Sequence, residues 1–255
     1  MNISQHDIES LLYNSVTSAR DVGGDLDIWF QSRDFRFLTF ILENYRESQS
    51  QLFQDLWVLF EFKERQRYNQ YQIFVEFGAT DGKTISNTFL LDKKYKWMGI
   101  LAEPAKIWHK DLMANRYRDN VYIDHRCVVG SNDFGAKIIF EETSQPDLSH
   151  ISGNTAYRPI DTTKTYEVET ITLNDLIKRR FPKERISFLS IDTEGNELEI
   201  LKTFDFAQYG PNLIAVEHNH RPDREDIYKL MASNGYIRVF ERFSKWDDWY
   251  VRSNW

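Results

Sequence analysis

Cysteine is nearly absent from the sequence, with Cys127 as the single thiol among 255 residues. One cysteine cannot form an internal disulfide, and it excludes zinc and redox motifs that need pairs of cysteines. Long apolar runs are also missing, since the strongest N-terminal run, LWVLF at 56–60, is far shorter than the roughly 20 residues of a membrane-spanning helix. Blocks of Lys and Arg are absent too, and the formal net charge is −7. We therefore expect no membrane span and no broad basic surface for nucleic acid.

The sequence begins MNISQHDIESLLYNSV, without the basic start and apolar core of a secretory signal peptide. Together with the low cysteine content, this indicates a cytoplasmic protein. The remaining composition is that of an ordinary globular protein, with 41% hydrophobic, 28% charged and 15% aromatic residues. The length suits one large domain or a domain with an appendage.

Two patterns divide the chain near residue 70. Before this point, apolar residues recur at spacings of three and four in IESLLYNSV and in FRFLTFILENYRESQSQLFQDLWVLFEFKERQR, which predicts helices. From residue 71 onward, strand-like apolar runs alternate with helical stretches, and this predicts an open, mostly parallel sheet with helices on both faces. We expect a helical N-terminal extension over residues 1–70 and an α/β domain over residues 71–255. The last stretch, YIRVFERFSKWDDWYVR, predicts two closing strands and an antiparallel edge.

The expected elements of the α/β domain follow from these runs. Strands are predicted at 71–77, 97–104, 120–129, 136–142, 166–171, 185–192 and 211–219. Helices are predicted at 84–95, 105–116, 172–181, 196–204 and 224–235. Thr172 and Asp175 form a capping-box variant at the start of one of them. The polar, turn-rich stretch 143–165 between strands predicts a surface loop.

Acidic and polar residues follow nearly every predicted strand of the sheet. Sheets of this kind bind ligands outside the carboxyl ends of their strands, so we expect these residues to converge on one site. They are Glu76 with the turn 78–82, Glu103 with Pro104, Asp124 with Arg126 and Cys127, Asp192 with Thr193 and Glu194, and Glu217 with His218 and Asn219.

The turn after the first strand, in FVEFGATDG at 74–82, is bounded by Gly78 and Gly82. Glycine lets a backbone approach a ligand closely, and the start of the predicted next helix would offer free N–H groups. The GxGxxG spacing is missing, which weighs against a NAD-linked oxidoreductase, whereas Glu76 and Asp81 add negative charge that suits a cationic ligand. Glu103 lies roughly 20 residues further on, where an acid can accept the hydroxyls of a ribose. The pattern predicts a site for a nucleoside-bearing cofactor.

Together, FVEFGATDG, SNT, GILAEP, VETITLNDL, FLSIDTEGNELEIL and AVEHN resemble the FkbM-type S-adenosylmethionine-dependent methyltransferases. The resemblance runs from about residue 50 to near the end, and IDTEGNELEIL is its most specific part. It implies a Rossmann-like class I methyltransferase fold, with a seven-stranded, mostly parallel sheet whose last strand is antiparallel. Thr80 stands where many methyltransferases have a middle glycine.

The resemblance also implies roles at a cofactor site. The residues that would border the methionine part of S-adenosylmethionine are Glu76, Gly78, Ala79 and Gly82. Glu103 would hold the ribose, the segment from Asp124 through Cys127 to Val128 would flank the adenine, and Asn87 and Thr88 would reach the amino-acid end. The turn and the strand ends add Asp81, Pro104 and Asp192 to this set.

Transfer of a methyl group to a hydroxyl benefits from a general base. The candidates at the strand ends are Asp192, Glu194, Glu217 and His218. Two structural alternatives stay open: His218 as a strand-end histidine bonded to a carboxylate, and Asp192 as the cap of the following helix. A divalent metal, magnesium or manganese, is a further possibility, because Asp192, Glu217, His218 and Asn219 offer oxygen and imidazole ligands.

The function that these residues favour is O-methylation of a hydroxyl on a sugar, a polysaccharide or a glycosylated small molecule. The loop 143–165 would meet this acceptor through His150, Asn154, Tyr157 and Arg158, or it is a plain surface loop. N-methylation, a non-catalytic nucleoside-binding or assembly module, and a protein-binding scaffold stay open as alternatives. The N-terminal helices and the aromatic group 246–255 are candidate contacts of a homodimer.

Overall fold

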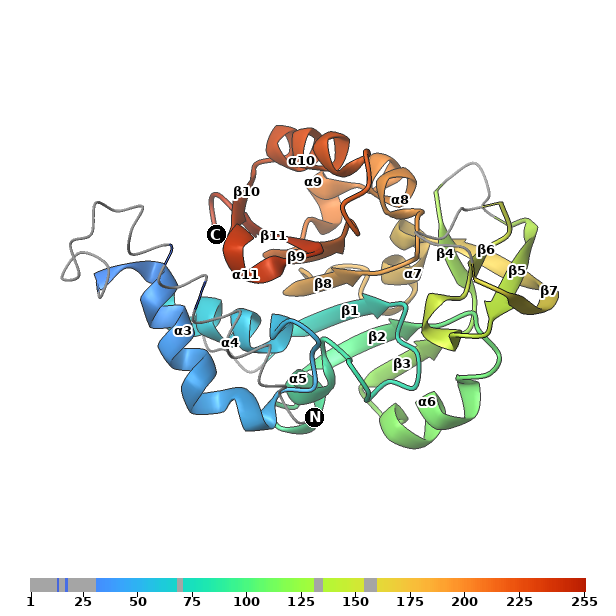
Figure 1. The fold of residues 1–255 in the computed structure, drawn as a ribbon, viewed down its shortest axis with the longest axis horizontal. Coiled ribbons are helices and arrows are strands. Elements are labelled where there is room, and N and C mark those ends of the chain that lie inside the picture. Colours follow the sequence, from blue (N-terminus) through green and yellow to red (C-terminus); the bar gives the residue numbers. More distant parts are fainter. Residues whose placement is uncertain (1–12, 14–16, 18–30, 68–70, 131–134, 154–159) are drawn as a thin grey trace.

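A seven-stranded sheet forms the centre of the protein in the computed structural model, which describes residues 13, 17, 31–67, 71–130, 135–153 and 160–255 (Figure 1). Its strands, in order across the sheet, are β10 (Tyr236–Val239), β11 (Asp247–Arg252), β9 (Leu213–Glu217), β8 (Phe188–Ile191), β1 (Ile73–Phe77), β2 (Met98–Ala102) and β3 (Val121–Asp124). Strand β11 runs antiparallel to both β9 and β10, and the pairs from β9 to β3 are all parallel. A seven-stranded, mostly parallel sheet with its last strand antiparallel is the arrangement that the resemblance implies.

Helices cover both faces of the sheet. One face, called the α4 face, packs against α3 (Arg33–Asn44), α4 (Gln54–Glu64), α5 (Phe89–Lys93), α6 (His109–Arg116) and α11 (Glu241–Ser244). The other face, called the α8 face, packs against α7 (Leu173–Arg180), α8 (Glu197–Thr203), α9 (Phe206–Tyr209) and α10 (Arg224–Ser233). A short 3-10 helix, Tyr45–Glu47, follows α3.

The side chains of each strand alternate between these two faces. In β1, Phe74 belongs to the core of the α4 face, whereas Ile73 and Val75 belong to the core of the α8 face. The same alternation places Leu213 and Ala215 of β9 on the α4 face. Successive strand residues point to opposite faces of the sheet. Residues two apart in a strand therefore have the same parity and face the same helices, whereas direct neighbours face opposite ones.

Helix α4 is part of the same core as the sheet. Trp57 is fully buried, and its ring stacks on Trp249 of β11 at a centroid distance of 5.0 Å. The helices predicted for the N-terminal extension are found at α3 and α4, and the helix predicted from IESLLYNSV lies outside the described residues. The domain boundary at residue 70 stays a prediction. Because α4 shares its core with the sheet, its removal would expose apolar surface of the α/β domain.

A second, smaller sheet stands beyond the carboxyl ends of β1, β2 and β3 (Figure 1). Its order is β4 (Cys127–Val129), β7 (Thr162–Thr172), β5 (Lys137–Thr143) and β6 (His150–Ile151), and the 3-10 helix Pro146–Leu148 precedes β6. The single strand predicted at 120–129 was therefore wrong. Asp124 Oδ1 accepts a hydrogen bond from the Arg126 amide at 3.0 Å, and this local turn directs the chain out of β3 into β4. The strand at 136–142 and the strand at 166–171 both belong to this second sheet.

The helix predicted at 84–95 begins only at Phe89. The segment before it stays irregular because its polar groups bond to Glu76 instead of forming helical turns: Ser86 Oγ donates to Glu76 Oε2 at 3.0 Å, and the Asn87 amide donates to Oε1 at 2.7 Å. The expected helix start beside the glycine turn is thus absent from this part of the chain. The Thr172 cap of α7 is confirmed, since its hydroxyl accepts from the Asp175 amide.

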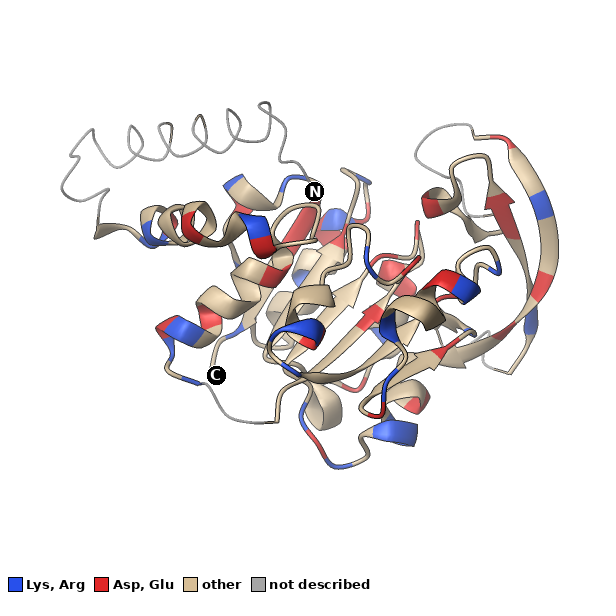
Figure 2. Cartoon of the chain, turned by 90° about the horizontal axis from the view of Figure 1, so that it is seen from below, with Lys and Arg blue, Asp and Glu red and all other residues tan. Residues whose placement is uncertain are grey.

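Charged residues of both signs are mixed over helices, strands and loops in Figure 2. No helix among the described residues is long and apolar enough to cross a membrane.

Candidate active site

A cavity lies at the carboxyl ends of the central strands, beneath the second sheet. About 980 Å³ of empty space lies within it, part of which is open solvent. Of the residues predicted for the site, those that line the cavity are Glu76, Gly78, Ala79, Asn87, Glu103, Pro104, Cys127, Val128, Asp192, Glu194 and Glu217. The strand ends thus converge as the sequence predicts.

The glycine turn brings the backbone against the end of β8. Gly78 has φ +75, and a Cβ at this position would lie 2.1 Å from the Asp192 carbonyl oxygen, so only glycine fits. Gly82 has φ +74, and a Cβ there would lie 2.6 Å from Arg116 Cγ and from Leu112 Cδ1. Gly82 therefore serves the packing of α6 against the turn, and the residues that line the cavity do not include it.

Glu103 is buried at the end of β2, with 4% of its surface exposed. Its carboxylate accepts from the Thr80 amide at 2.8 Å and from the Ala105 amide at 2.7 Å. Burial raises its pKa to about 7, although the two amide bonds act against this shift. Each carboxylate oxygen keeps a second lone pair, so Glu103 can still accept hydrogen bonds from a ligand in the cavity.

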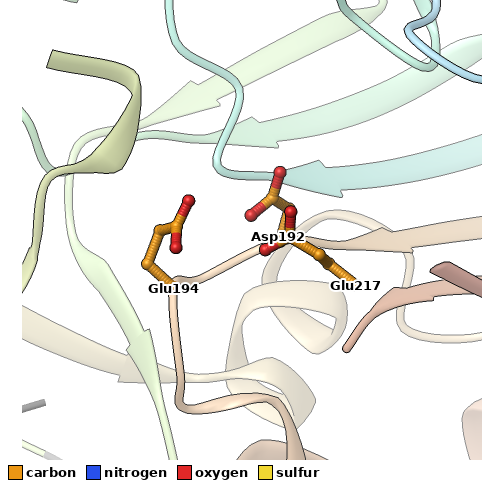
Figure 3. Close-up of side chains that lie close together, drawn as sticks. All are labelled: Asp192, Glu194 and Glu217. Carbon is orange, nitrogen blue, oxygen red and sulfur yellow. The ribbon is translucent and has the colours of Figure 1, made fainter. Parts of the chain in front are cut away.

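Three carboxylates gather on the next strands and form what we call the carboxylate cluster, Asp192, Glu194 and Glu217 (Figure 3). One oxygen from each lies within 4.8 Å of the others. Burial, followed by the charge of Glu194, raises the pKa of Asp192, and burial followed by the charge of Asp192 raises that of Glu217. Asp192 and Glu217 are also hydrogen-bonded to each other, so this pair retains a proton at neutral pH.

Strand parity explains which side chains reach the cavity. Glu217 has the parity of Leu213 and Ala215, so it lies on the α4 face. Asp247 is its register partner on β11, and it lines the cavity together with Gln54, whose Nε2 donates to Asp247 Oδ2 at 2.8 Å. Burial raises the pKa of Asp247 to about 7.

The same rule corrects the expectation for His218. It follows Glu217 directly, so its ring lies on the opposite face, with Nε2 3.7 Å from Asp248 Oδ1. His220 donates its amide to His218 Nδ1 at 2.9 Å, and burial lowers the pKa of His218 to about 4. Within the described residues, the group that could hold a metal ion is the carboxylate cluster. It includes Glu194 in place of the predicted His218 and Asn219.

Strand parity also corrects the expectation that Asp124 faces the site. Its neighbour of the same parity, Tyr122, packs in the core of the α8 face, and the Asp124 carboxylate is bound by the Arg126 guanidinium at 2.5 and 2.9 Å. Burial alone would raise its pKa, but the bonds from Arg126 outweigh burial and lower it. Arg126, Cys127 and Val128 line the cavity in its place.

In the loop that follows β1, three residues predicted for the site differ in their access to the cavity: Asp81, Asn87 and Thr88. Asp81 accepts from the Lys83 and Thr84 amides at 2.8 and 2.7 Å and thereby closes the turn. Thr88 is fully buried and donates to Glu76. Asn87 lines the cavity, and its Oδ1 is buried without a hydrogen-bond partner in the described chain. Asp81 and Thr88 are therefore structural parts of the loop, whereas Asn87 presents an acceptor that a ligand can satisfy.

The second sheet supplies the roof of the cavity. Phe140, Pro146, Asp147 and Ser149 line it, so the stretch 143–165 meets the site as predicted, but through other residues. His150 Nδ1 lies 3.0 Å from the Leu148 carbonyl oxygen and the ring packs within the small sheet. The other predicted contacts of this loop, Asn154, Tyr157 and Arg158, lie outside the described residues.

Three residues that line the cavity were not predicted from the sequence, namely Gln51, Gln54 and Asp247. A signal for Asp247 was present, since it precedes Trp249 and Val251 at alternate positions of a predicted strand and so shares their face. No comparable signal exists for Gln51 and Gln54, because their place depends on how the segment before α4 folds over the sheet.

Comparisons with known proteins agree with this geometry. The family model described as "Methyltransferase FkbM domain" matches residues 76–238, more than half of the chain. No curated protein sequence matches the chain at a significant level.

Three solved structures are similar to the chain at a low level. The chain is 15% identical to a Methanococcus jannaschii fibrillarin pre-rRNA processing protein, with a TM-score of 0.38 over 72% of this chain and 66% of that one. It is 12% identical to the N-terminal domain of human METTL16, with a TM-score of 0.41 over 76% and 66% of the two chains. It is 10% identical to the same domain in complex with SAH, with a TM-score of 0.42 over 78% of this chain and 68% of that one. The chain thus spans about two thirds of the length of these proteins.

Proposed function

Because the chain belongs to the FkbM methyltransferase family, we propose that it is an S-adenosylmethionine-dependent O-methyltransferase that acts on a hydroxyl of a sugar, a glycan or a glycosylated small molecule. The observation that carries the proposal is the meeting of the glycine turn, Glu103 and the carboxylate cluster in one cavity. Family membership supports the methyl donor, and the chemistry of the cavity wall supports the class of acceptor.

The residues present suit this cofactor. Glu103 offers a carboxylate for the hydroxyls of a ribose, and the unpaired Asn87 Oδ1 offers an acceptor for an ammonium group. Gly78 and Ala79 line the cavity without large side chains. When bound, S-adenosylmethionine supplies an electrophilic methyl group on a positively charged sulfur, and a wall rich in carboxylates favours that charge.

The carboxylate cluster supplies a place for the proton of the acceptor. Asp192 and Glu217 together retain one proton, and the oxygens left ionised have a raised pKa, which makes them stronger bases than an exposed carboxylate. An acceptor hydroxyl held against this pair loses its proton to a carboxylate oxygen as its own oxygen takes the methyl group. Most of the remaining acceleration would come from holding both reactants in line.

The part of the cavity wall that we assign to the acceptor combines polar groups with apolar surface. Gln51 and Gln54 provide amides, Asp147 and Ser149 provide oxygens, and Phe140 and Pro146 provide apolar surface. Amides and carboxylates that bond hydroxyls, next to an apolar surface, fit a sugar ring. An amine is the second candidate acceptor, favoured by the number of carboxylates around the site, which would attract a protonated amine.

A panel assay tests the proposal. Purified protein is incubated with S-adenosylmethionine and with neutral sugars, glycosides, amino sugars and simple amines, and methylated products are identified by mass spectrometry. We expect methyl ethers of a neutral sugar or glycoside, with S-adenosylhomocysteine formed in equal amount. Products only on nitrogen would replace O-methylation with N-methylation. Cofactor binding without turnover on any acceptor would favour the non-catalytic module.

The same assay with EDTA, and with added magnesium or manganese, tests the metal. The carboxylate cluster is the candidate ligand set, because hard divalent cations prefer carboxylate oxygens. A rate that is unchanged by EDTA would contradict a metal requirement. The homodimer, the cytoplasmic location and the lack of nucleic-acid partners stay predictions.

A further inference from the structure

Arg116, at the end of α6, is a charged side chain with no exposed surface. We propose that Arg116 is the positioning residue of the cofactor site: it holds the irregular segment 82–88 in the shape that presents Asn87 to the cavity. This inference rests on the proposed function, because it assigns a role in binding S-adenosylmethionine.

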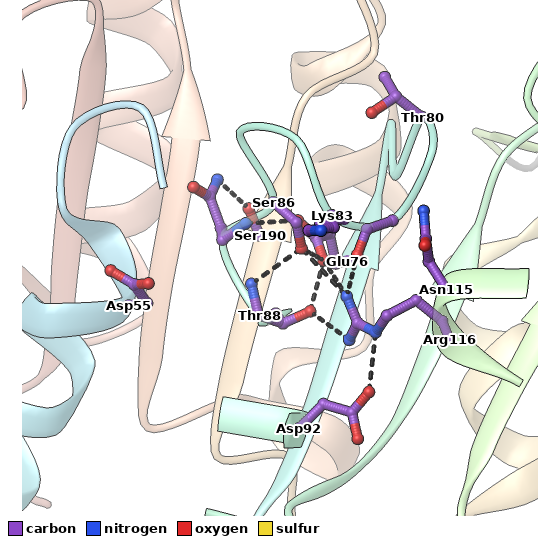
Figure 4. A network of polar contacts seen from close by, with 12 residues as sticks. Asp55, Glu76, Thr80, Lys83, Ser86, Thr88, Asp92, Asn115, Arg116 and Ser190 are labelled. Carbon is purple, nitrogen blue, oxygen red and sulfur yellow. Dashed lines mark hydrogen bonds and ion pairs between the residues drawn. The ribbon is translucent and has the colours of Figure 1, made fainter. Parts of the chain in front are cut away.

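The guanidinium contacts both ends of the segment (Figure 4). Nη1 donates to the Gly82 carbonyl at 2.8 Å and to Ser86 Oγ at 3.1 Å. Nη2 donates to Thr88 Oγ1 at 2.9 Å. One planar group with a fixed set of donors therefore sets the distance between Gly82 and Thr88.

Carboxylates hold the guanidinium itself in place. Asp92 of α5 accepts from Arg116 Nε at 2.8 Å, and Glu76 Oε2 lies 3.8 Å from Nη1. Arg118, which is partly exposed, binds the other oxygen of Asp92, and Lys93 Nζ lies 3.8 Å from Asp92 Oδ2. Burial lowers the pKa of Arg116, but a guanidinium stays charged at any relevant pH. Such a group is stable in the interior only when its partners are complete.

The segment needs this support because its backbone is strained and does not form a helix. Ile85 has φ +54, which is an unfavourable conformation for a β-branched residue. Beyond it, Asn87 donates its amide to Glu76 Oε1 at 2.7 Å and its Nδ2 to Ser190 Oγ at 2.9 Å. Asn87 lines the cavity, and its Oδ1 is buried without a hydrogen-bond partner among the described residues.

This arrangement gives Glu76 a role different from the one implied by the resemblance. Its two oxygens accept from Ser86, Asn87 and Thr88, so the carboxylate is bound inside the protein and shapes the loop together with Arg116. Arg116 acts on the cofactor through the position of Asn87, whereas Glu76 both lines the cavity and holds the segment.

Arg118 offers a matched control. It pairs with the same Asp92 but donates to the Trp97 carbonyl, and both of these partners lie outside the segment 82–88. Arg116→Lys keeps the charge but cannot reach three acceptors at once, and Arg118→Lys makes the same chemical change outside the segment. Dissociation constants for S-adenosylhomocysteine and midpoints of thermal unfolding are measured for both variants and the wild type.

We expect Arg116→Lys to weaken binding by about tenfold or more, since small displacements of a binding group cause losses of this size. Arg118→Lys should change binding by less than about threefold even where its unfolding midpoint falls equally. In turnover, the KM for S-adenosylmethionine should rise in Arg116→Lys more than kcat falls, which a purely structural role would not produce.

Binding by a folded Arg116→Lys that equals the wild type would overturn the inference. If that variant does not fold, Thr88→Val decides, because it removes the hydroxyl that links Arg116 to Glu76 and keeps the side-chain volume. It should weaken binding by about threefold or more, and unchanged binding would refute the role of the segment. A wild type that does not bind S-adenosylhomocysteine would refute the proposed function instead.

Discussion

Glu103→Gln should weaken the binding of S-adenosylhomocysteine by about 100-fold, the largest expected loss of affinity at any single residue. Two hydroxyls donating to an ionised carboxylate contribute roughly 1.5–3 kcal/mol each, and an amide accepts at one oxygen only. The change keeps the size of the side chain but leaves the Thr80 and Ala105 amides with weaker acceptors. Calorimetric titration measures the loss, and Glu199→Gln on the surface of α8 serves as the control with unchanged affinity.

The protonation of Glu103 gives this prediction a pH signature. Its pKa in the free protein is about 7, raised by burial from an ordinary value of 4.5. A folded pKa above the unfolded one stabilises the protein below the unfolded value, and this stability, about 3 kcal/mol at most, is lost as the pH rises through 7. Since hydroxyls bind best to the carboxylate, affinity should increase from pH 6 to pH 8 with proton release at pH 6. Glu103→Gln should remove both dependences, and pH-independent affinity in the wild type would contradict the role of Glu103.

Asp192→Asn should lower kcat by about 100- to 10,000-fold, the range that general bases contribute, while the affinity for S-adenosylhomocysteine changes only a few-fold. The reason is that the hydrogen bond within the pair acts to lower the pKa of Asp192 and to raise that of Glu217. Asp192 is therefore the member left ionised to accept a proton, and an amide cannot take the proton of an acceptor. Rates and dissociation constants measured on one preparation separate the two effects. An equal loss of binding and turnover would show that Asp192 serves the cofactor instead of the base.

His218→Asn is the matched comparison for Asp192. His218 lies on the α8 face beside Asp248, so its replacement should lower stability and leave kcat within about threefold of the wild type. A loss of kcat as large as that of Asp192→Asn would contradict the assignment of these two strand ends to opposite faces.

Strand periodicity accounts for much of what the sequence could predict at the site. The runs that form β1, β2, β8 and β9 are apolar enough to be recognised as buried parallel strands, and each ends in a polar residue that the topology brings to one edge. Alternation within a strand then decides between neighbours, and it separates Glu217 from His218 and Asp247 from Asp248. Applied to the sequence, this rule would have removed His218 and Asp124 from the candidates.

Other features depend on contacts between distant segments and leave no local pattern. Helix propensity predicts a helix from Thr84 onward, but tertiary bonds to Glu76 and Arg116 keep the chain irregular up to Thr88. The second sheet is a comparable case, because the split of 120–129 into β3 and β4 follows from where β7 lies. Gln51 and Gln54 reach the cavity only because α4 packs on Trp249.

Calorimetric titration of the wild type with S-adenosylhomocysteine, with NAD as the control ligand, tests whether this cavity binds the methyl donor. We expect one site per chain with a dissociation constant of about 1 to 100 µM, the range of ordinary cofactor and substrate concentrations, and no heat of binding with NAD. Absence of binding to the sulfur nucleoside in a protein that unfolds cooperatively would contradict the assignment of this cavity to S-adenosylmethionine.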